Sequence, residues 1–138
     1  MEDHISAAGG HRAGACPFCS LDPTLIVMED QHAIAVRDKY PVSEGHTLVI
    51  PRRHLRSIFD LEAIEQAALW SMVTELRSFL IRQFAPDGFN VAVNDGEAAG
   101  QTVDHAHAHV IPRYKGDQPD PRGGVRNVIP ERARYWAS

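Results

Sequence analysis

The sequence predicts a single α+β domain in which one long helix covers a five-stranded, mainly antiparallel sheet. Five short apolar segments have the composition and the flanking turn residues that are typical of strands. One longer segment has the apolar spacing of an amphipathic helix, and mostly short turns connect the strands. The chain has 138 residues, of which 43% are hydrophobic, and this is enough for one packed core.

The first half of the chain contains three of the predicted strands. Residues 1–15 are rich in Gly, Ala, His and charged side chains, so we expect a flexible tail there and a single domain over residues 16–138. Strands are expected at residues 25–30 and 32–38, joined by a short turn, and at residues 46–51 after a loop with Pro and Gly. The short turn predicts that the first two strands form a hairpin.

The long helix is predicted over residues 60–84. Ser57 and Asp60 have the spacing of a capping box, with Asp in place of the usual Glu or Gln. Pro86 and Gly88 end the helical pattern. The apolar side chains that would face the sheet repeat at helical spacing: Ile64, Ala68, Met72 and Leu76, widened by Leu61, Leu69, Val73 and Leu80.

Two further strands are expected after the helix, at residues 89–94 and in the histidine-bearing segment 104–113. A loop with glycines, residues 95–100, separates them. Residues 115–138 are rich in Lys, Asp, Pro and Gly. We expect mostly coil there, with one short extended piece at residues 125–129.

Charge and hydropathy exclude several classes of protein. The 18 acidic and 14 basic residues give a formal net charge of -4, which gives no reason to expect binding to nucleic acid or to a membrane surface. No apolar run approaches the roughly 18 residues that cross a bilayer. The polar N-terminus lacks the basic and apolar regions of a secretory signal, so we expect a soluble cytoplasmic protein.

Three histidines, His105, His107 and His109, alternate with small apolar residues. Alternate side chains of a strand point to opposite faces, so all three imidazoles are expected on one face. Such a row could hold a metal ion, or one imidazole could be a nucleophile whose neighbours position the substrate. A surface strand that happens to carry histidines is the third interpretation.

The residues before this row favour the nucleophile. Gly96 and Gly100 allow the backbone to approach an anion closely. Asn94, Gln101 and Thr102 supply neutral hydrogen-bonding groups around it. Few carboxylates stand nearby to complete a catalytic metal site.

Cys16 and Cys19, separated by two residues, can bring two thiolates to one metal ion. Zinc usually takes four nitrogen and sulfur ligands, so two histidines would have to complete the site. The candidates are His32, His46, His54 and one histidine of the row. A redox pair is less favoured, because no βαβ unit is visible around the cysteines, and two inert cysteines are the remaining alternative.

These motifs resemble the histidine triad (HIT) family of nucleotide hydrolases and transferases. The segment 105–111 matches the family's H-φ-H-φ-H-φ-φ signature, in which φ is an apolar residue. Residues 38–54 and 94–103 resemble the family's second block and the lead-in to its triad. Cys16-Pro17-Phe18-Cys19 is similar to the opening of the zinc-containing bacterial branch. The resemblance therefore spans most of the chain, in the family's order.

The resemblance implies a mechanism and a role for each motif residue. His107 would attack the α-phosphorus of a nucleotide, and water or another acceptor would then release a nucleoside monophosphate. Asp38 would bind the ribose hydroxyls, and the strands around residues 26–36 would line the base pocket. The residues implied to hold the phosphate and to help the leaving group depart are His109, Thr102 and Gln101, with Asn94 and the Gly100 backbone assisting and His46 supporting His109.

A structural zinc ion and a second subunit are also implied. In the zinc-containing branch, the ion is bound at the positions of Cys16, Cys19, His54 and His105. A site closed by four protein ligands has no open catalytic position, so its role would be structural. The family usually forms homodimers in which two subunits share one continuous sheet.

The substrate is implied only as a class, a nucleoside phosphoramidate or a dinucleoside polyphosphate that contains AMP or GMP. Arg122 and Arg126 could contact extra phosphates, or they could be solvated loop residues. His107 has to be neutral to attack, so activity is expected to fall below about pH 6.5, the usual histidine pKa. Two alternatives remain: a metal-dependent hydrolase that uses the three histidines as ligands, and a nucleotide-binding sensor without catalysis.

Overall fold

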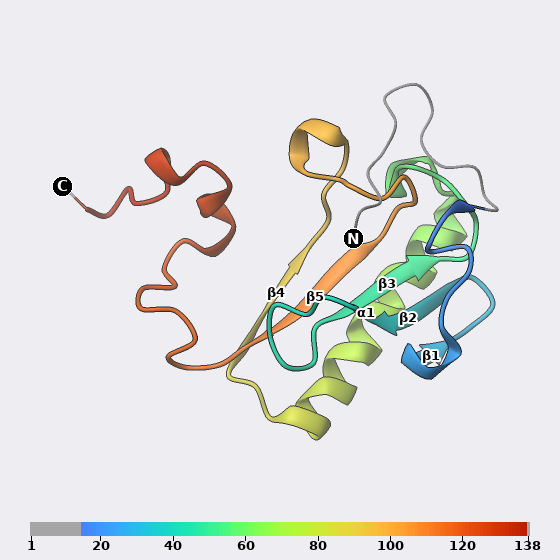
Figure 1. The fold of residues 1–138 in the computed structure, drawn as a ribbon, viewed down its shortest axis with the longest axis horizontal. Helices are drawn as coiled ribbons and strands as arrows, with labels where there is room; N and C mark the ends of the chain where they lie inside the picture. Colours follow the sequence, from blue (N-terminus) through green and yellow to red (C-terminus); the bar gives the residue numbers. More distant parts are fainter. Residues whose placement is uncertain (1–14, 138) are drawn as a thin grey trace.

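A computed structural model describes residues 15–137 and shows an α+β domain with one five-stranded sheet (Figure 1). The predicted tail falls almost entirely outside the described residues. The strands are β1 (Ile26–Glu29), β2 (Ala33–Arg37), β3 (Thr47–Pro51), β4 (Gly88–Ala92) and β5 (Ala108–Arg113). The fold class is confirmed, and the first four strands lie within one or two residues of their expected positions. None of the helices in the described part of the chain is long and apolar enough to cross a membrane.

The sheet has the order β1-β2-β3-β5-β4, and every neighbouring pair is antiparallel. The turn between β1 and β2 is closed by the Asp30 carboxylate, which accepts hydrogen bonds from the backbone N–H groups of His32 and Ala33. The single long helix α1 (Ala63–Phe84) packs across one face of the sheet (Figure 1). The other face is left for the histidines and the segment that precedes β1.

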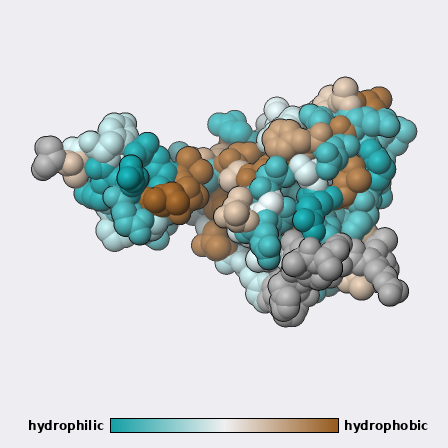
Figure 2. Space-filling model, turned by 90° about the horizontal axis from the view of Figure 1, so that it is seen from above, coloured by the Kyte–Doolittle hydropathy of each residue, from teal (hydrophilic) through white to brown (hydrophobic). Residues whose placement is uncertain are grey.

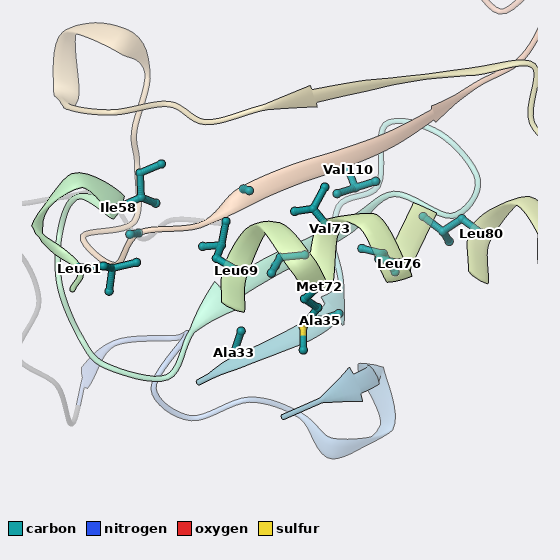
Figure 3. Packing of buried hydrophobic residues seen from close by; sticks show 13 residues of the cluster. Ala33, Ala35, Ile58, Leu61, Leu69, Met72, Val73, Leu76, Leu80 and Val110 are labelled. Atoms are coloured by element: carbon teal, nitrogen blue, oxygen red, sulfur yellow. The ribbon is translucent and has the colours of Figure 1, made fainter. Parts of the chain in front are cut away.

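The main core lies between α1 and the sheet, where large helix side chains pack on small sheet residues (Figure 3). From the helix come Leu69, Met72, Val73, Leu76 and Leu80; from the sheet and its approaches come Ala33, Ala35, Val49, Ala106, Ala108 and Val110. Most side chains of the predicted apolar stripe therefore do pack against the sheet. Its first residue, Ile64, is an exception because 63% of its surface is exposed.

The helix begins later than predicted. Ser57 does act as a cap, since its hydroxyl accepts a hydrogen bond from the backbone N–H of Phe59, but it caps a short 3₁₀ helix, Ile58–Asp60. Leu61 is extended and interrupts the helical path. The α-helix starts after Glu62, whose backbone N–H donates to the Glu65 carboxylate at 2.8 Å. The capping box is thus five residues further along the chain.

The histidine row does not lie on one regular strand, which corrects the prediction. β5 begins at Ala108, so only His109 belongs to it, and the chain bends at residues 103–105. The reason is a set of contacts to the end of β3 and to the loop that follows it. The backbone N–H of Ala106 donates to the Leu55 carbonyl at 2.7 Å, and Nε2 of His105 donates to the Pro51 carbonyl at 2.8 Å.

Residues 115–137 are coiled and contain no extended piece, which corrects a second prediction. Residues Gly124–Val128 form a 3₁₀ helix, and Pro130–Arg132 form another. Gly123 has a φ of 88°, and this left-handed conformation turns the chain into the first of them. Figure 2 shows this segment projecting from the body of the protein.

Replacing Ala108 with Leu is expected to lower the free energy of unfolding by about 1–3 kcal/mol, because overpacking a dense core forces side chains and backbone to shift. Ala108 is fully buried between the sheet and α1. Denaturant unfolding measures the effect. The matched control is Ala67→Leu on the exposed side of α1, where a change as large as that of Ala108→Leu would contradict the explanation.

Candidate active site and metal site

Two cysteines and two histidines from three separate segments converge beside the sheet. The potential ligand atoms of Cys16, Cys19, His54 and His105 all lie within 4.8 Å of one another. Sγ of Cys19 is 3.2 Å from Nδ1 of His54, and Sγ of Cys16 is 3.5 Å from Nδ1 of His105. The two Nδ1 atoms are 3.2 Å apart. The structure therefore brings together the four residues predicted to bind zinc.

The chemistry of the four side chains fits a zinc ion. Because Nε2 of His105 donates to the Pro51 carbonyl, its Nδ1 has a lone pair that points at the cluster. Burial lowers the pKa of His105 to about 4, which keeps the imidazole in the neutral, metal-binding form. Burial raises the pKa of the Cys16 thiol to about 11, so its thiolate needs a nearby cation. Two sulfur and two nitrogen ligands form a standard closed zinc site.

An ion pair that the sequence did not predict braces this cluster. The Arg56 guanidinium contacts the buried Asp104 carboxylate at 2.5 Å. Asp104 is adjacent to His105, and Arg56 is two residues after His54. The pair thus ties the loop after β3 to the bend before β5, and it holds the two histidine ligands at a fixed separation.

Replacing Asp104 with Asn is expected to weaken zinc binding about tenfold, because groups that orient metal ligands typically contribute 10–100-fold to affinity. Competition with a chromogenic chelator measures the dissociation constant. Asp117→Asn is the control, since Asp117 pairs with Arg113 instead. Equal zinc affinity in Asp104→Asn and the unmodified chain would refute a bracing role for the pair.

A pocket of about 300 Å³ opens beside the cluster, on the face of the sheet opposite α1. One wall is apolar and comes from the segment before β1 and from the strands: Pro17, Phe18, Leu21, Leu25, Val36, Leu48 and Val103. The other part is polar and contains six of the predicted site residues: Asp38, Asn94, Gly100, Thr102, His107 and His109. Pro17 and Phe18 were missed, although their place between the two cysteines was a usable signal.

His107 has one nitrogen fixed and the other free. Nδ1 donates a hydrogen bond to the carbonyl oxygen of His105 at 2.9 Å, so the neutral ring carries its lone pair on Nε2. The Phe18 ring packs edge-on against it, with 4.9 Å between the ring centroids. Burial lowers the pKa of His107 to about 4. The lone pair of Nε2 is thus available well below pH 6.5, which corrects the expected titration midpoint.

His109 is oriented by a chain of hydrogen bonds. The backbone N–H of Val42 donates to Nδ1 of His46 at 3.1 Å, so the proton of neutral His46 is on Nε2. That Nε2 lies 3.0 Å from Nδ1 of His109 and 3.4 Å from an Asp38 oxygen. Burial lowers the pKa of both histidines, against the opposing effect of Asp38. Nδ1 of His109 therefore accepts a hydrogen bond from Nε2–H of His46, and the Nε2–H of His109 is a donor.

This tautomer argues against a second metal site. The ligand atoms of Asp38, His46 and His109 also lie within 4.8 Å of one another. A metal there would need a lone pair on Nε2 of His46, where the Val42 hydrogen bond requires a proton. His105 meanwhile belongs to the cysteine cluster. The three histidines thus do not converge on one ion, as the metal-dependent alternative requires.

Gln101 has other surroundings than expected, and Arg122 and Arg126 are loop residues, one of the two interpretations given for them. The Gln101 amide N–H₂ donates to the carbonyls of Arg56 and Val103, and its oxygen accepts from the backbone N–H of Gly96. Gln101 is buried and holds the loop in place, outside the lining of the pocket. Arg122 pairs with Asp120, and the guanidinium of Arg126 donates to the carbonyls of Ala133 and Arg132, so both are engaged within the C-terminal segment.

Comparisons with known proteins agree with this geometry. The HIT domain family matches residues 21–116. The protein hit of Bacillus subtilis is 38% identical over 112 residues, which cover 78% of this chain and 77% of that protein. Adenylylsulfatase HINT3 of Arabidopsis thaliana is 35% identical over 106 residues, 74% of this chain and 54% of that protein. The crystal structure of a zinc-bound histidine triad family protein from Mycobacterium smegmatis matches with a TM-score of 0.70 and 33% identity, covering 79% of this chain and 86% of that one.

The fold and the site define an α+β domain in which three histidines lead into an inner strand, and the first of them belongs to a Cys/His cluster that could hold a metal. The chain belongs to the HIT domain family, because the family matches more than half of it and the relatives are above 30% identical.

Proposed function

We propose that this protein is a nucleotide hydrolase or nucleotidyltransferase that acts through a covalent nucleotidyl-histidine. The observation that carries the proposal is the fixed tautomer of His107, whose Nδ1–H is held by the His105 carbonyl while Nε2 keeps its lone pair. His107 also lines the 300 Å³ pocket, whose apolar wall suits a nucleoside base. A buried neutral imidazole beside a phosphate-sized polar region suits attack on phosphorus.

The reaction has two steps. Nε2 of His107 attacks the α-phosphorus, a P–N bond forms, and the bond from phosphorus to the leaving group breaks. The Nε2–H of His109 donates a hydrogen bond to the departing atom and stabilises its developing negative charge, and His46 fixes this orientation through the contact with Nδ1 at 3.0 Å. The departing group takes up any proton it needs from water. Water then attacks the phosphorus, the P–N bond breaks with its electron pair returning to Nε2 of His107, and a nucleoside monophosphate is released while the proton of the water passes to solvent.

The neighbouring residues bind the nucleotide in this scheme. Asp38 accepts hydrogen bonds from the ribose hydroxyls, and Asn94, Thr102 and the Gly100 backbone hold the phosphate. Gly100 has a φ of 99°, a conformation that favours glycine and presents its backbone to the pocket. Gln101 contributes indirectly by holding this loop.

The substrate class includes nucleoside phosphoramidates, dinucleoside polyphosphates and adenylyl sulfate, each built on AMP or GMP. The adenylylsulfatase among the relatives supports a substrate in which an adenylate is bonded to a good leaving group. The experiment is to incubate the protein with radiolabelled members of each class and to look for labelled protein after a rapid quench. No covalent label with any of them would contradict the proposed mechanism.

Zinc at Cys16, Cys19, His54 and His105 is proposed to be structural. When bound, it would crosslink the segment before β1, the loop after β3 and the bend before β5. Four protein ligands leave it no open position for a substrate. The zinc-bound relative from Mycobacterium smegmatis supports the choice of metal.

A cytoplasmic homodimer is the proposed working form. β4 lies at an edge of the sheet, so its outer backbone groups can pair with a strand of a second copy. Two cysteines that serve as zinc ligands suit a reducing compartment, where thiols stay reduced. Sedimentation equilibrium measures the subunit number, and a monomer at micromolar concentration would contradict the dimer.

The rate of covalent adduct formation is expected to stay nearly constant between about pH 8 and pH 5. The pKa of His107, lowered by burial to about 4, leaves the imidazole neutral over this range. Protonation removes the lone pair of Nε2 only as the pH falls through about 4. Single-turnover measurements with zinc present test this, and a midpoint near the usual histidine value of about 6.5 would show that His107 titrates as if exposed.

A further inference from the structure

The loop at residues 16–19 belongs to both the metal site and the pocket. Cys16 and Cys19 supply the two sulfurs of the cluster, and the two residues between them, Pro17 and Phe18, line the pocket. Phe18 packs edge-on against the rings of His107 and His105, with centroid distances of 4.9 and 6.1 Å. One short loop therefore contacts a metal ligand and the nucleophile together.

The segment at residues 16–25 has few attachments to the sheet. Its backbone hydrogen bonds are local, from Cys19 to Cys16, from Leu25 to Asp22 and, at the junction with β1, from Ile26 to Pro23. Among the described residues, its only hydrogen-bonding contacts to parts of the chain beyond that junction are those of the two thiols with His54 and His105. Its other attachment is apolar packing of Phe18, Leu21 and Leu25 on Val36, Leu48 and Ile50.

Each of these attachments would be strengthened by a ligand. A metal ion would join the two thiols to His54 and His105. A nucleoside base in the pocket would add apolar contacts to Phe18 and its neighbours in the wall. A ligand that orders a segment reduces the entropic cost of binding for a second ligand that needs the same segment ordered.

We infer that zinc and nucleotide bind cooperatively, because the loop at residues 16–19 closes both sites and Phe18 is the positioning residue that links them. This inference rests on the nucleotide pocket proposed above. Coupling between two binding sites is reciprocal, so zinc strengthens nucleotide binding by the same factor as nucleotide strengthens zinc binding. We expect about tenfold, within the usual range for coupled sites.

The test measures zinc affinity of the full chain by competition with a chromogenic chelator, with and without saturating AMP. AMP is expected to tighten zinc binding about tenfold. The reciprocal measurement is AMP affinity by calorimetry, which is expected to be about tenfold weaker after zinc removal. The chelator and AMP without protein show that AMP itself does not compete for the metal.

Phe18→Ala tests whether Phe18 couples the metal site to the pocket. This variant retains all four metal ligands and is expected to bind zinc with an affinity that no longer responds to saturating AMP. Phe18→Leu, which keeps an apolar side chain without the ring contact to His107, is the second variant if the first does not fold. The matched control is Phe59→Ala, because Phe59 is 67% exposed and lies outside the pocket lining. The control is expected to keep the tenfold response.

The outcomes distinguish the coupling from the proposed function. If the protein binds AMP and its zinc affinity stays the same, the coupling is wrong and the nucleotide pocket stands. If the protein does not bind AMP at all, the nucleotide pocket and the coupling are both overturned. A tenfold response that persists in both Phe18 variants would overturn the role of Phe18.

Discussion

Replacing His107 with Ala is expected to abolish the covalent adenylyl-protein and to lower turnover by a factor on the order of 10⁴ or more, as the loss of a covalent nucleophile does elsewhere. Neither of the other two histidines of the row can take over. Nδ1 of His109 accepts from His46, which leaves the Nε2 of His109 protonated, and His105 directs its Nδ1 lone pair into the cysteine cluster. Rapid-quench labelling with a radiolabelled adenosine phosphoramidate measures the adduct, and steady-state assays measure turnover.

His32→Ala is the matched control for this experiment. His32 is at the turn between β1 and β2 and does not line the pocket. The His32→Ala protein is expected to form the covalent adduct and to turn over substrate at the same rates as the unmodified chain. AMP affinity of His107→Ala, measured by calorimetry, shows whether the pocket is still formed. Covalent label that survives in a folded, AMP-binding His107→Ala protein would assign the nucleophile to another residue.

The division of labour among the three histidines was only partly predictable. Alternation predicted that the imidazoles share a face, and the resemblance assigned each a role. The geometry that separates them comes from contacts distant in the chain: Pro51 fixes the tautomer of His105, and Val42 fixes that of His46. Both partners act through backbone groups. A backbone N–H or carbonyl has no side-chain signature, so no pattern in the sequence indicates which one will be near.

The α-helix and the bend before β5 show the same limit. Ser57 has the residue type of a cap and does cap a turn, but the extended conformation at Leu61 delays the helix to Ala63. The ion pair between Arg56 and Asp104 ties this bend to the loop after β3. The sequence presents these as two unrelated charged residues, and only the antiparallel pairing of β3 with β5 brings them together.

Features that depend only on residues close together in the chain were predicted well. Two cysteines three positions apart reach one centre through a single turn, which the hydrogen bond from the Cys19 N–H to the Cys16 carbonyl closes. Which histidines complete the centre could not follow from spacing, since several were candidates. The structure selects His54 and His105 because the loop after β3, which carries His54, and the bend before β5, which carries His105, both lie beside the two cysteines.

Removal of zinc is expected to lower the free energy of unfolding by about 4 kcal/mol or more, the linkage value for a ligand present at about 1,000 times its dissociation constant. For a chain of this size, the corresponding fall in melting temperature is on the order of 10–20 °C. The effect is large because, apart from the junction with β1, the two thiols make the only hydrogen-bonding contacts between residues 16–25 and the rest of the described chain. Thermal unfolding before and after dialysis against a chelator measures it.

Turnover separates a structural zinc ion from a catalytic one. At saturating substrate, the folded zinc-free protein is expected to turn over at nearly the normal rate, since His107 and His109 take no part in the cluster. The control is the double variant Cys16→Ser and Cys19→Ser, whose melting temperature should no longer respond to the chelator. If saturating turnover stops at once in zinc-free protein that remains folded, the ion takes part in the chemistry and the structural assignment is wrong. If turnover persists, the free Nε2 of His107 is sufficient for attack.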